Sequence, residues 1–330
     1  MLQFYDQQGR KDLPWQQNKN AYKVWVSEIM LQQTQVKTVI PYYLKFLKSF
    51  PTITKLAKAE VDDVLTHWAG LGYYSRARNL HSCANIIMAQ HAGKFPKQLE
   101  QLTSLPGIGE STAGAILSLT YDLPEAILDG NVKRVLARVF LVDGWYGNAK
   151  VSKELWQLSR KYTPTERTGH FNQAMMDLGA GICNRAKPLC NECPLSSHCE
   201  AYLQDKTAEY PHRKQKKQTP SKEATMLLIF DNNDHILLEK RPPSGIWGGL
   251  WSLPETGDTK PIKDIIGQFK HTFSHYHLHA TVVSAKQNSK RVKQIEDDHT
   301  LTWHNINELT NIALPTPIKK FLINHLKTSG

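Results

Sequence analysis

Long hydrophobic runs are missing from this 330-residue chain. No stretch of eighteen apolar residues occurs, and the opening segment, MLQFYDQQGRKDLPW, lacks the apolar core of a signal peptide. We therefore expect no membrane partner and a location inside the cell. Acidic residues are in the minority: the chain has 30 Asp and Glu residues and 41 Lys and Arg residues, which gives a formal net charge of +11. Charge alone favours nucleic acid or an anionic membrane as a partner, of which we expect nucleic acid, although ordinary solubility would also explain the surplus.

Cysteine is scarce, and four of the five cysteines are crowded into residues 183–199. In a reducing compartment such crowding favours metal ligation over disulfides. The candidate ligands are Cys183, Cys190, Cys193 and Cys199. Zinc ribbons usually pair two C-x2-C units and only one occurs here, so the spacing favours an iron–sulfur cluster over zinc. The fifth, Cys83, is expected to be a small buried side chain on a helix.

The spacing of apolar residues changes near residue 204. Before it the spacing is mostly helical and predicts an all-α domain over residues 1–203, in which Pro41 should kink or split its helix. Residues 204–222 are basic and poor in apolar side chains, which predicts an interdomain linker. Residues 223–330 contain strand-like segments and a C-terminal helix, which predicts a smaller α+β domain. Further helices are expected near residues 54–69, 75–91, 97–103, 111–120, 131–141, 151–161 and 170–180.

Two glycines, Gly107 and Gly109, separate helical segments within LPGIGESTAGAIL, residues 105–117. They permit a tight turn, and the backbone N–H groups at the start of the next helix would face an anion. The segment can therefore form a hairpin that holds a DNA phosphate. A plain helix connector is the alternative when the hairpin is considered alone.

Two carboxylates stand out in the helical region. Asp129 precedes a helix whose apolar stripe begins at Val132, so it is either a helix cap or a catalytic group. Glu28 lies within an apolar helix but beside its core stripe, and a solvated glutamate is the simpler interpretation. Gln32 and Gln33 follow at the expected helix end, where amides could enter a base stack or lie in a polar loop.

Several motifs together carry a family resemblance. The hairpin, the downstream Asp129 and the six-two-five cysteine spacing resemble the endonuclease III, or helix-hairpin-helix, superfamily of DNA glycosylases. SEIMLQQTQV, GLGYYSRARNL, ILDGNVKRVLAR and FNQAMMDLGA resemble its adenine DNA glycosylase branch, the MutY family. The resemblance implies a two-lobed helical domain with DNA in its cleft and a [4Fe–4S] cluster. It also implies excision of adenine mispaired with 8-oxoguanine or guanine, in base excision repair.

The resemblance also assigns catalytic roles. Glu28 would be the general acid that protonates adenine, Asp129 would stay ionised and stabilise charge on the sugar, and Asn131 would orient Asp129 or the water. Glycosylase-lyases of this superfamily have a nucleophilic lysine where this chain has Ser111, so the enzyme should be monofunctional. Residues expected to contact duplex DNA are Gln32, Gln33, Tyr73, Gly107, Gly109, Ser111, Arg185 and Lys187.

The C-terminal domain resembles a Nudix module through RPPSGIWGGLWSLPE, residues 241–255. Residues 256–270 lack the carboxylate-rich helix that holds magnesium in Nudix hydrolases, so we expect a recognition module rather than a hydrolase. HTFSHYHLH, residues 271–279, matches the family's Phe-Ser-His loop. Phe273, Ser274 and His275 are therefore the candidates for recognising 8-oxoguanine.

Three alternatives remain at this stage: a glycosylase-lyase of endonuclease III type, a catalytically silent mismatch-binding module, and a Nudix hydrolase. Ser111 counts against the glycosylase-lyase, and the two carboxylates count against the silent binding module. The missing Nudix helix counts against the hydrolase. We expect a monomer that binds duplex DNA containing an adenine:8-oxoguanine mispair. Such a protein would be bacterial and cytoplasmic, and associated with the nucleoid when bound to DNA.

Overall fold

The computed structural model describes residues 1–214, 218–256, 264–285 and 300–328. The chain divides into two compact units. The first unit consists of Met1–Ala57 and Ser82–Lys216, and the second of Lys58–His81 and Lys217–Gly330. Within the described part, no helix is long and apolar enough to cross a membrane.

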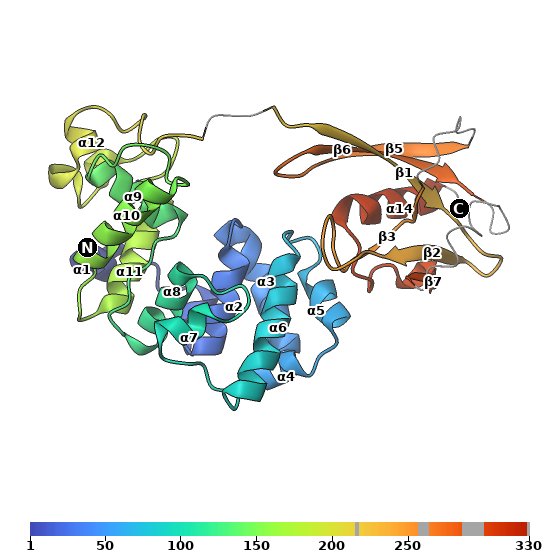
Figure 1. Ribbon diagram of the computed structural model, residues 1–330, viewed down its shortest axis with the longest axis horizontal. Coiled ribbons are helices and arrows are strands. Elements are labelled where there is room, and N and C mark those ends of the chain that lie inside the picture. The colour runs from blue at the N-terminus through green and yellow to red at the C-terminus, as the bar shows by residue number, and fades with distance from the viewer. Residues whose placement is uncertain (215–217, 257–263, 286–299, 329–330) are drawn as a thin grey trace. The chain divides into compact units, whose positions relative to one another are not determined.

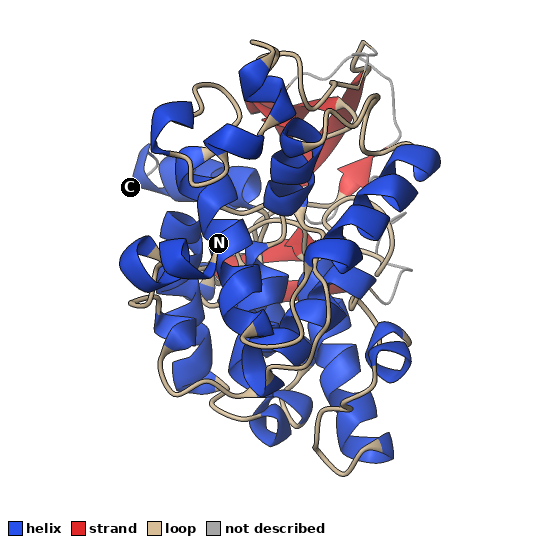
Figure 2. Ribbon diagram, turned by 90° about the vertical axis from the view of Figure 1, so that its left-hand side faces the viewer, coloured by secondary structure: helices blue, strands red, loops and turns tan. Residues whose placement is uncertain are grey.

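The first unit is built from helices, and every strand of the described chain lies after residue 220 (Figures 1 and 2). This confirms the predicted order of an all-α region followed by a region with sheets. The helices up to residue 203 are α1 (Leu2–Gln8), α2 (Ala21–Leu31), α3 (Val36–Ser49), α4 (Ile53–Ala57), α5 (Val61–Trp68), α6 (Ser75–Gln90), α7 (Leu99–Thr103), α8 (Glu110–Tyr121), α9 (Gly130–Val139), α10 (Ala149–Tyr162), α11 (Thr168–Asp177) and α12 (Glu200–Leu203). Short turns are η1 (Pro14–Gln16), η3 (Cys190–Glu192), η4 (Ser196–His198) and η5 (Ile306–Glu308), and η2 (Leu178–Ile182) is a π-helical turn.

Two helix predictions need correction. The single helix expected near residues 54–69 is two helices, α4 and α5, and α5 restarts with Asp62 and Asp63 in its first turn, where acidic side chains favour a helix N-terminus. Pro41 does not split α3, which runs without a break from Val36 to Ser49. Pro41 is exposed, so the Lys37 carbonyl that loses its helical partner lies near water.

Close backbone contacts hold α8 at the centre of the first unit. A Cβ added to Gly114 would lie 2.2 Å from the Ala126 carbonyl oxygen, and one added to Gly169 would lie 2.6 Å from that of Ser118. Glycine therefore lets α11 and the segment leading to residue 129 approach α8 more closely than any side chain would permit. On the other side of that segment, Val132, Val135 and Leu136 of α9 are buried in the core, as their helical spacing predicts.

The second unit contains two small sheets. One has the strand order β4-β1-β6-β5 and the other β3-β2-β7. β1 pairs in parallel with β6, and the other pairs are antiparallel. Helix α14 (Thr316–Thr328) packs against β5 through Phe321 and Phe269, whose ring centroids are 6.0 Å apart. The strands are β1 (Ser221–Leu228), β2 (His235–Lys240), β3 (Trp251–Ser252), β4 (Glu255–Thr256), β5 (Ile265–Thr272), β6 (His277–Ser284) and β7 (Leu301–Asn305).

The described start of the predicted linker is bound to the first unit. Arg138 Nε donates to the Tyr210 carbonyl at 2.8 Å. His212 Nδ1 lies 3.4 Å from Asp143 Oδ1, and Lys214 Nζ lies 5.1 Å from the ring centroid of Trp145. Strand β1 begins at Ser221. Residues 257–263 belong to the segment expected to lack a Nudix helix, and they lie outside the described residues. The domain boundaries at residues 203 and 223 remain a prediction.

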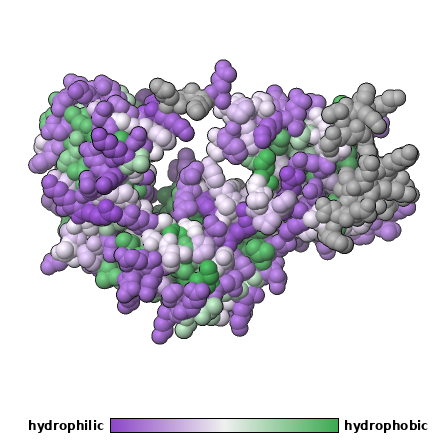
Figure 3. All heavy atoms as spheres, in the orientation of Figure 1, coloured by the Kyte–Doolittle hydropathy of each residue, from purple (hydrophilic) through white to green (hydrophobic). Residues whose placement is uncertain are grey.

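Large apolar side chains are scattered over the surface of the units. The face drawn in Figure 3 is mostly hydrophilic, with small apolar areas between polar ones. Such scatter is normal for a folded protein. Among the described residues the exposed large apolar side chains are Leu44, Val61, Tyr73, Tyr162, Leu189, Leu203 and Ile265.

Candidate active site

Asp129 caps helix α9. Its Oδ1 accepts hydrogen bonds from the backbone N–H groups of Asn131 at 3.0 Å and Val132 at 2.8 Å, and its Oδ2 accepts from Asn131 Nδ2 at 3.2 Å. The sequence left a choice between a cap and a catalytic carboxylate. The cap is present, and because it leaves Oδ2 with a single side-chain partner, it is compatible with a catalytic role as well.

The hairpin glycines lie next to the Asp129 segment. Gly107 has a φ of +78°, which a residue with a side chain adopts only with strain, and Gly109 is the N-cap of α8. No atom lies within 4 Å of a Cβ added to Gly109, so space is open beside this turn. Ser111 Oγ accepts from the Leu128 backbone N–H at 3.0 Å. This hydrogen bond holds the backbone of Leu128, the residue before Asp129. Ser111 stands at the position where the family resemblance implies a lysine in the lyases.

Gln32 ties the end of α2 to the same helix. Its Nε2 donates to Thr112 Oγ1 in the first turn of α8, at 3.4 Å. Gln33, the next residue, is exposed and has a φ of +57°. Tyr73 also has a positive φ, of +49°, and its side chain is 47% exposed. Large side chains in the left-handed region cost about 1 to 3 kcal/mol and are enriched at functional sites, which is consistent with both residues being presented to DNA.

Glu28, in the middle of α2, is electrostatically coupled to Asp129. Burial first, and then the negative charge of Asp129, raise the pKa of Glu28 to about 8. Among the described residues, no side-chain hydrogen bond to the Glu28 carboxyl offsets this effect. The side chain is only partly buried, but its surroundings favour the neutral form of the carboxyl, which counts against the simpler interpretation as a freely solvated glutamate.

The environment of Asp129 is different. Burial raises the pKa of Asp129 above its ordinary value as well, although the hydrogen bonds from Val132 and Asn131 and the positive charge of Arg134 partly offset this rise. Every cause acting on Glu28 raises its pKa and so favours the protonated carboxyl. Several of the causes acting on Asp129 lower its pKa and so favour the carboxylate. When the pair holds a single proton, that proton therefore resides on Glu28.

Arg134 was not singled out in the sequence, although it organises this end of α9. Its Nη2 donates to Asn131 Oδ1 at 2.9 Å and to the Gly179 carbonyl at 2.6 Å, and its Nε donates to the Cys183 carbonyl at 2.8 Å. These bonds fix the Asn131 amide, which then donates to Asp129. In the sequence, the position of Arg134 just over one turn after Asp129 was only a weak signal of this role, because arginines on exposed helix faces are common.

The cysteine segment packs on the same helix. Arg138 Nη1 lies 3.4 Å from Cys183 Sγ and donates to the Asn184 carbonyl at 2.8 Å. Arg185 and Lys187 are exposed on the loop that follows. The isolated Cys83 is fully buried on α6, as predicted.

The four clustered thiols affect one another electrostatically. Burial raises the pKa of the Cys193 thiol to about 11; the charges of Cys183, Cys199 and Cys190 add to this rise, and a hydrogen bond from the Leu195 backbone opposes it. Within the described residues, no three Cys, His, Asp or Glu side chains gather closely enough to hold a single metal ion. A cube of four irons is larger than one ion, so its four cysteine ligands lie further apart than those of zinc. Four thiols on one short segment are a donor set of the kind that iron–sulfur clusters use.

The Phe-Ser-His loop lines a cavity of about 530 Å³ in the second unit. The loop is a tight turn closed by the Phe273 backbone N–H, which donates to the Tyr276 carbonyl at 2.9 Å. Ser274 and His275 are exposed at its tip. Tyr73 lines the same cavity, so the structure brings together a residue expected to contact DNA and the proposed recognition loop, which are far apart in the sequence.

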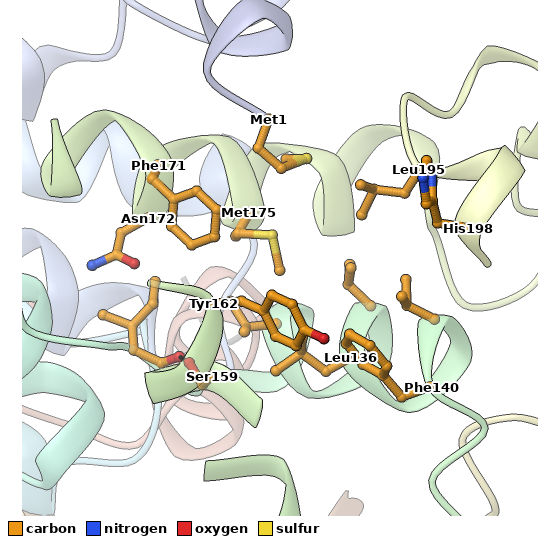
Figure 4. Close-up of a pocket in the computed structure, with 14 residues that line it drawn as sticks. Met1, Leu136, Phe140, Ser159, Tyr162, Phe171, Asn172, Met175, Leu195 and His198 are labelled. Atoms are coloured by element: carbon orange, nitrogen blue, oxygen red, sulfur yellow. Dashed lines mark hydrogen bonds between the residues drawn. The ribbon is translucent and has the colours of Figure 1, made fainter. Parts of the chain in front are cut away.

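A separate cavity of about 370 Å³ lies within the first unit (Figure 4). Its labelled lining includes Met1, Leu136, Phe140 and Met175, which project into a mainly apolar space. Neither Glu28 nor Asp129 is among its lining residues. We attribute it to packing within the core and not to substrate binding.

The raised pKa of Glu28 has a consequence for stability. Its folded pKa of about 8 exceeds the ordinary value of 4.5, so ionised Glu28 disfavours folding progressively as the pH rises from 4.5 to 8. Glu28→Gln should therefore raise Tm at pH 8, by roughly 5 °C, and raise it much less at pH 5. Thermal unfolding at both pH values tests this, with the exposed Glu154→Gln on α10 as control. An equal gain at both pH values would contradict the assigned environment of Glu28.

Comparison with known proteins identifies the families of the two domains. Residues 26–161 match the HhH-GPD superfamily of base excision DNA repair proteins, and residues 225–324 match the NUDIX domain. The fold resembles the solved structure of a thermostable thymine-DNA glycosylase, with 27% identity, a TM-score of 0.54, and coverage of 62% of this chain and 93% of that one. It also resembles endonuclease III in a non-covalent complex with DNA, at 20% identity and a TM-score of 0.53, covering 62% and 94%.

The similarity to curated proteins extends over nearly the whole chain. An adenine DNA glycosylase of Buchnera aphidicola subsp. Baizongia pistaciae (strain Bp) is 42% identical over 98% of this chain and 94% of its own. The adenine DNA glycosylase of Rattus norvegicus is 33% identical over 97% of this chain and 76% of its own. The chain therefore belongs to the adenine DNA glycosylase family, with a helix-hairpin-helix glycosylase domain followed by a Nudix-like domain.

Proposed function

We propose that this protein hydrolyses the N-glycosidic bond of adenine mispaired with 8-oxoguanine in duplex DNA, as a monofunctional, monomeric enzyme of the bacterial cytoplasm. The observation that carries the proposal is the coupled pair of carboxyls, Glu28 and Asp129: burial raises the pKa of both, and only Asp129 has hydrogen bonds and a nearby cation that oppose the rise. Such a pair separates a proton donor from a charge-stabilising carboxylate, which is the arrangement that glycosidic-bond hydrolysis requires.

The reaction follows from these two environments. The adenosine must leave the duplex before its glycosidic bond can be reached. Protonated Glu28 donates to adenine N7, so that adenine departs as a neutral base, and ionised Asp129 stabilises the positive charge that develops on the sugar. Water then adds to C1′ and loses its proton to the Glu28 carboxylate, which restores the starting state. Asn131, fixed by Arg134, would orient Asp129 or this water.

DNA binding is proposed for the surface around the hairpin. The open turn at Gly109, the left-handed Gln33 and the exposed Arg185 and Lys187 all lie in the first unit. Backbone N–H groups at the start of α8 would bind one phosphate, and the two cations would add sequence-independent contacts. Ser111 leaves this region without the amine that an obligatory Schiff base needs.

Recognition of 8-oxoguanine is proposed for the cavity in the second unit. Phe273 would pack against the base, while Ser274 and His275 offer donors and acceptors at the mouth. Tyr73, on the same cavity, would wedge between the bases. A residue that reads the oxidised base must have polar groups that are free to reach it, and the exposure of the loop tip supports this role.

The decisive experiment is single-turnover excision on labelled duplexes, with and without alkali after the reaction. We expect adenine opposite 8-oxoguanine to be excised, with strand breakage only after alkali, and an oxidised-pyrimidine duplex to remain intact. Breakage of the pyrimidine duplex without alkali would instead favour a glycosylase-lyase. Binding of the mispair without excision would favour a recognition module.

Removing the proton donor should stop excision while leaving DNA binding. Glu28→Gln is expected to lower the single-turnover rate by roughly two to four orders of magnitude, the usual loss for general acid catalysis. In the unaltered enzyme the rate should fall as the pH rises through about 8, because Glu28 then loses its proton. The residual rate of the variant should show no such fall. A normal rate in Glu28→Gln would refute the assignment.

The cysteine segment is proposed to hold a [4Fe–4S] cluster through Cys183, Cys190, Cys193 and Cys199. When bound, the cluster would cross-link the loop, and hydrolysis needs no electron from it. Cys193→Ser should reduce iron content and visible absorbance in the purified protein. Cys83→Ala, which changes a buried cysteine outside the segment, should leave both unchanged. Zinc in place of iron in the unaltered protein would refute the cluster.

A further inference from the structure

A tryptophan with an unusual backbone conformation lies in the wall of the second-unit cavity. Trp247 has a φ of +52°, although its side chain is among the largest, and that side chain is only 7% exposed. L-residues with large side chains rarely adopt this region, and they do so where the surrounding structure enforces it. The conformation turns the indole into the cavity wall beside the recognition loop.

The surrounding turn fixes this conformation from several sides. A Cβ added to Gly248 would lie 2.4 Å from the Pro243 carbonyl oxygen, so the chain cannot shift in that direction. The Leu250 backbone N–H donates to the Trp247 carbonyl at 2.9 Å, and the Arg78 guanidinium donates to the Gly248 carbonyl. Arg78 comes from α6 and lines the same cavity, within the same compact unit.

The indole contacts the base of the loop and leaves its tip free. The ring centroid of Trp247 lies 5.5 Å from that of Phe273 and 5.8 Å from that of His271, and the His271 and Phe273 rings meet edge to face at 4.5 Å. These are ordinary distances for packed aromatic pairs. Ser274 and His275 follow Phe273 directly and are exposed. The direction of their polar groups therefore depends on where Phe273 is held.

We propose that Trp247 is a positioning residue for recognition of the base opposite the adenine. Its indole fixes Phe273, and thereby directs Ser274 and His275 toward an oxidised guanine in the cavity. Trp247 donates no recognising group itself. The inference rests on the proposed function, because it concerns the contrast between 8-oxoguanine and guanine and leaves excision itself to Glu28 and Asp129.

The test compares single-turnover excision of adenine opposite 8-oxoguanine with excision opposite guanine. Trp247→Gly removes the indole and keeps the left-handed backbone, which glycine adopts freely. We expect the ratio of the two rates to fall by about tenfold, with the rate opposite guanine unchanged within twofold. Trp247→Phe, which restores an aromatic ring, should recover most of the ratio. Trp251→Ala is the control, since Trp251 packs on His304 and is absent from the cavity lining.

The outcomes separate this inference from the proposed function. An unaltered enzyme without preference for 8-oxoguanine would refute the proposed recognition, and with it this role. A preference that survives in Trp247→Gly, or equal losses on both duplexes, would overturn the positioning role alone. If Trp247→Gly does not fold, Trp247→Leu carries the test, since it retains apolar bulk without the aromatic face. An unchanged ratio in a folded Trp247→Leu enzyme would also overturn the proposal.

Discussion

The helix cap at Asp129 is the interaction on which the candidate site depends. Two backbone N–H groups of α9 bind one oxygen of this carboxylate, which fixes the side chain at the helix N-terminus, where the helix dipole stabilises negative charge. The same helix buries its apolar face in the core and presents Arg134 and Arg138 to the cysteine segment. One helix therefore aligns the carboxylate, the amide of Asn131 and the proposed cluster loop.

Burial gives the two carboxyls different chemistry. Both are partly buried, and burial alone would favour the neutral form of each. The cap supplies Asp129 with hydrogen bonds that favour its ionised form, whereas Glu28 has no such partner among the described residues and lies close enough to sense the charge of Asp129. A structural cap thus creates the difference in proton affinity between them. The choice between cap and catalyst posed by the sequence is therefore not exclusive.

Much of the architecture could be predicted because it depends on local patterns. Helical periodicity indicated most helices of the first unit, and Asp129 stood before a clear apolar stripe that is buried in the structure. The cluster segment that the cysteine spacing predicts stays a proposal. The break between α4 and α5 and the intact helix at Pro41 could not be predicted, since they depend on local capping and on exposure to water. The grouping of Lys58–His81 with the C-terminal half is a tertiary property that no local pattern records.

The functional details that escaped prediction share a physical cause. Arg134 acts through acceptors on residues 131, 179 and 183, which only the fold brings together. Trp247 is distinguished by its backbone angle, and three glycines nearby in the sequence gave no hint that a tryptophan would adopt the left-handed conformation. Gln33 and Tyr73 are strained in the same way, although neither is buried. Positive φ also occurs at Ala92, Asp122 and Leu141, which no proposal involves, so the backbone angle at Gln33 and Tyr73 is compatible with a role at DNA and does not by itself carry one.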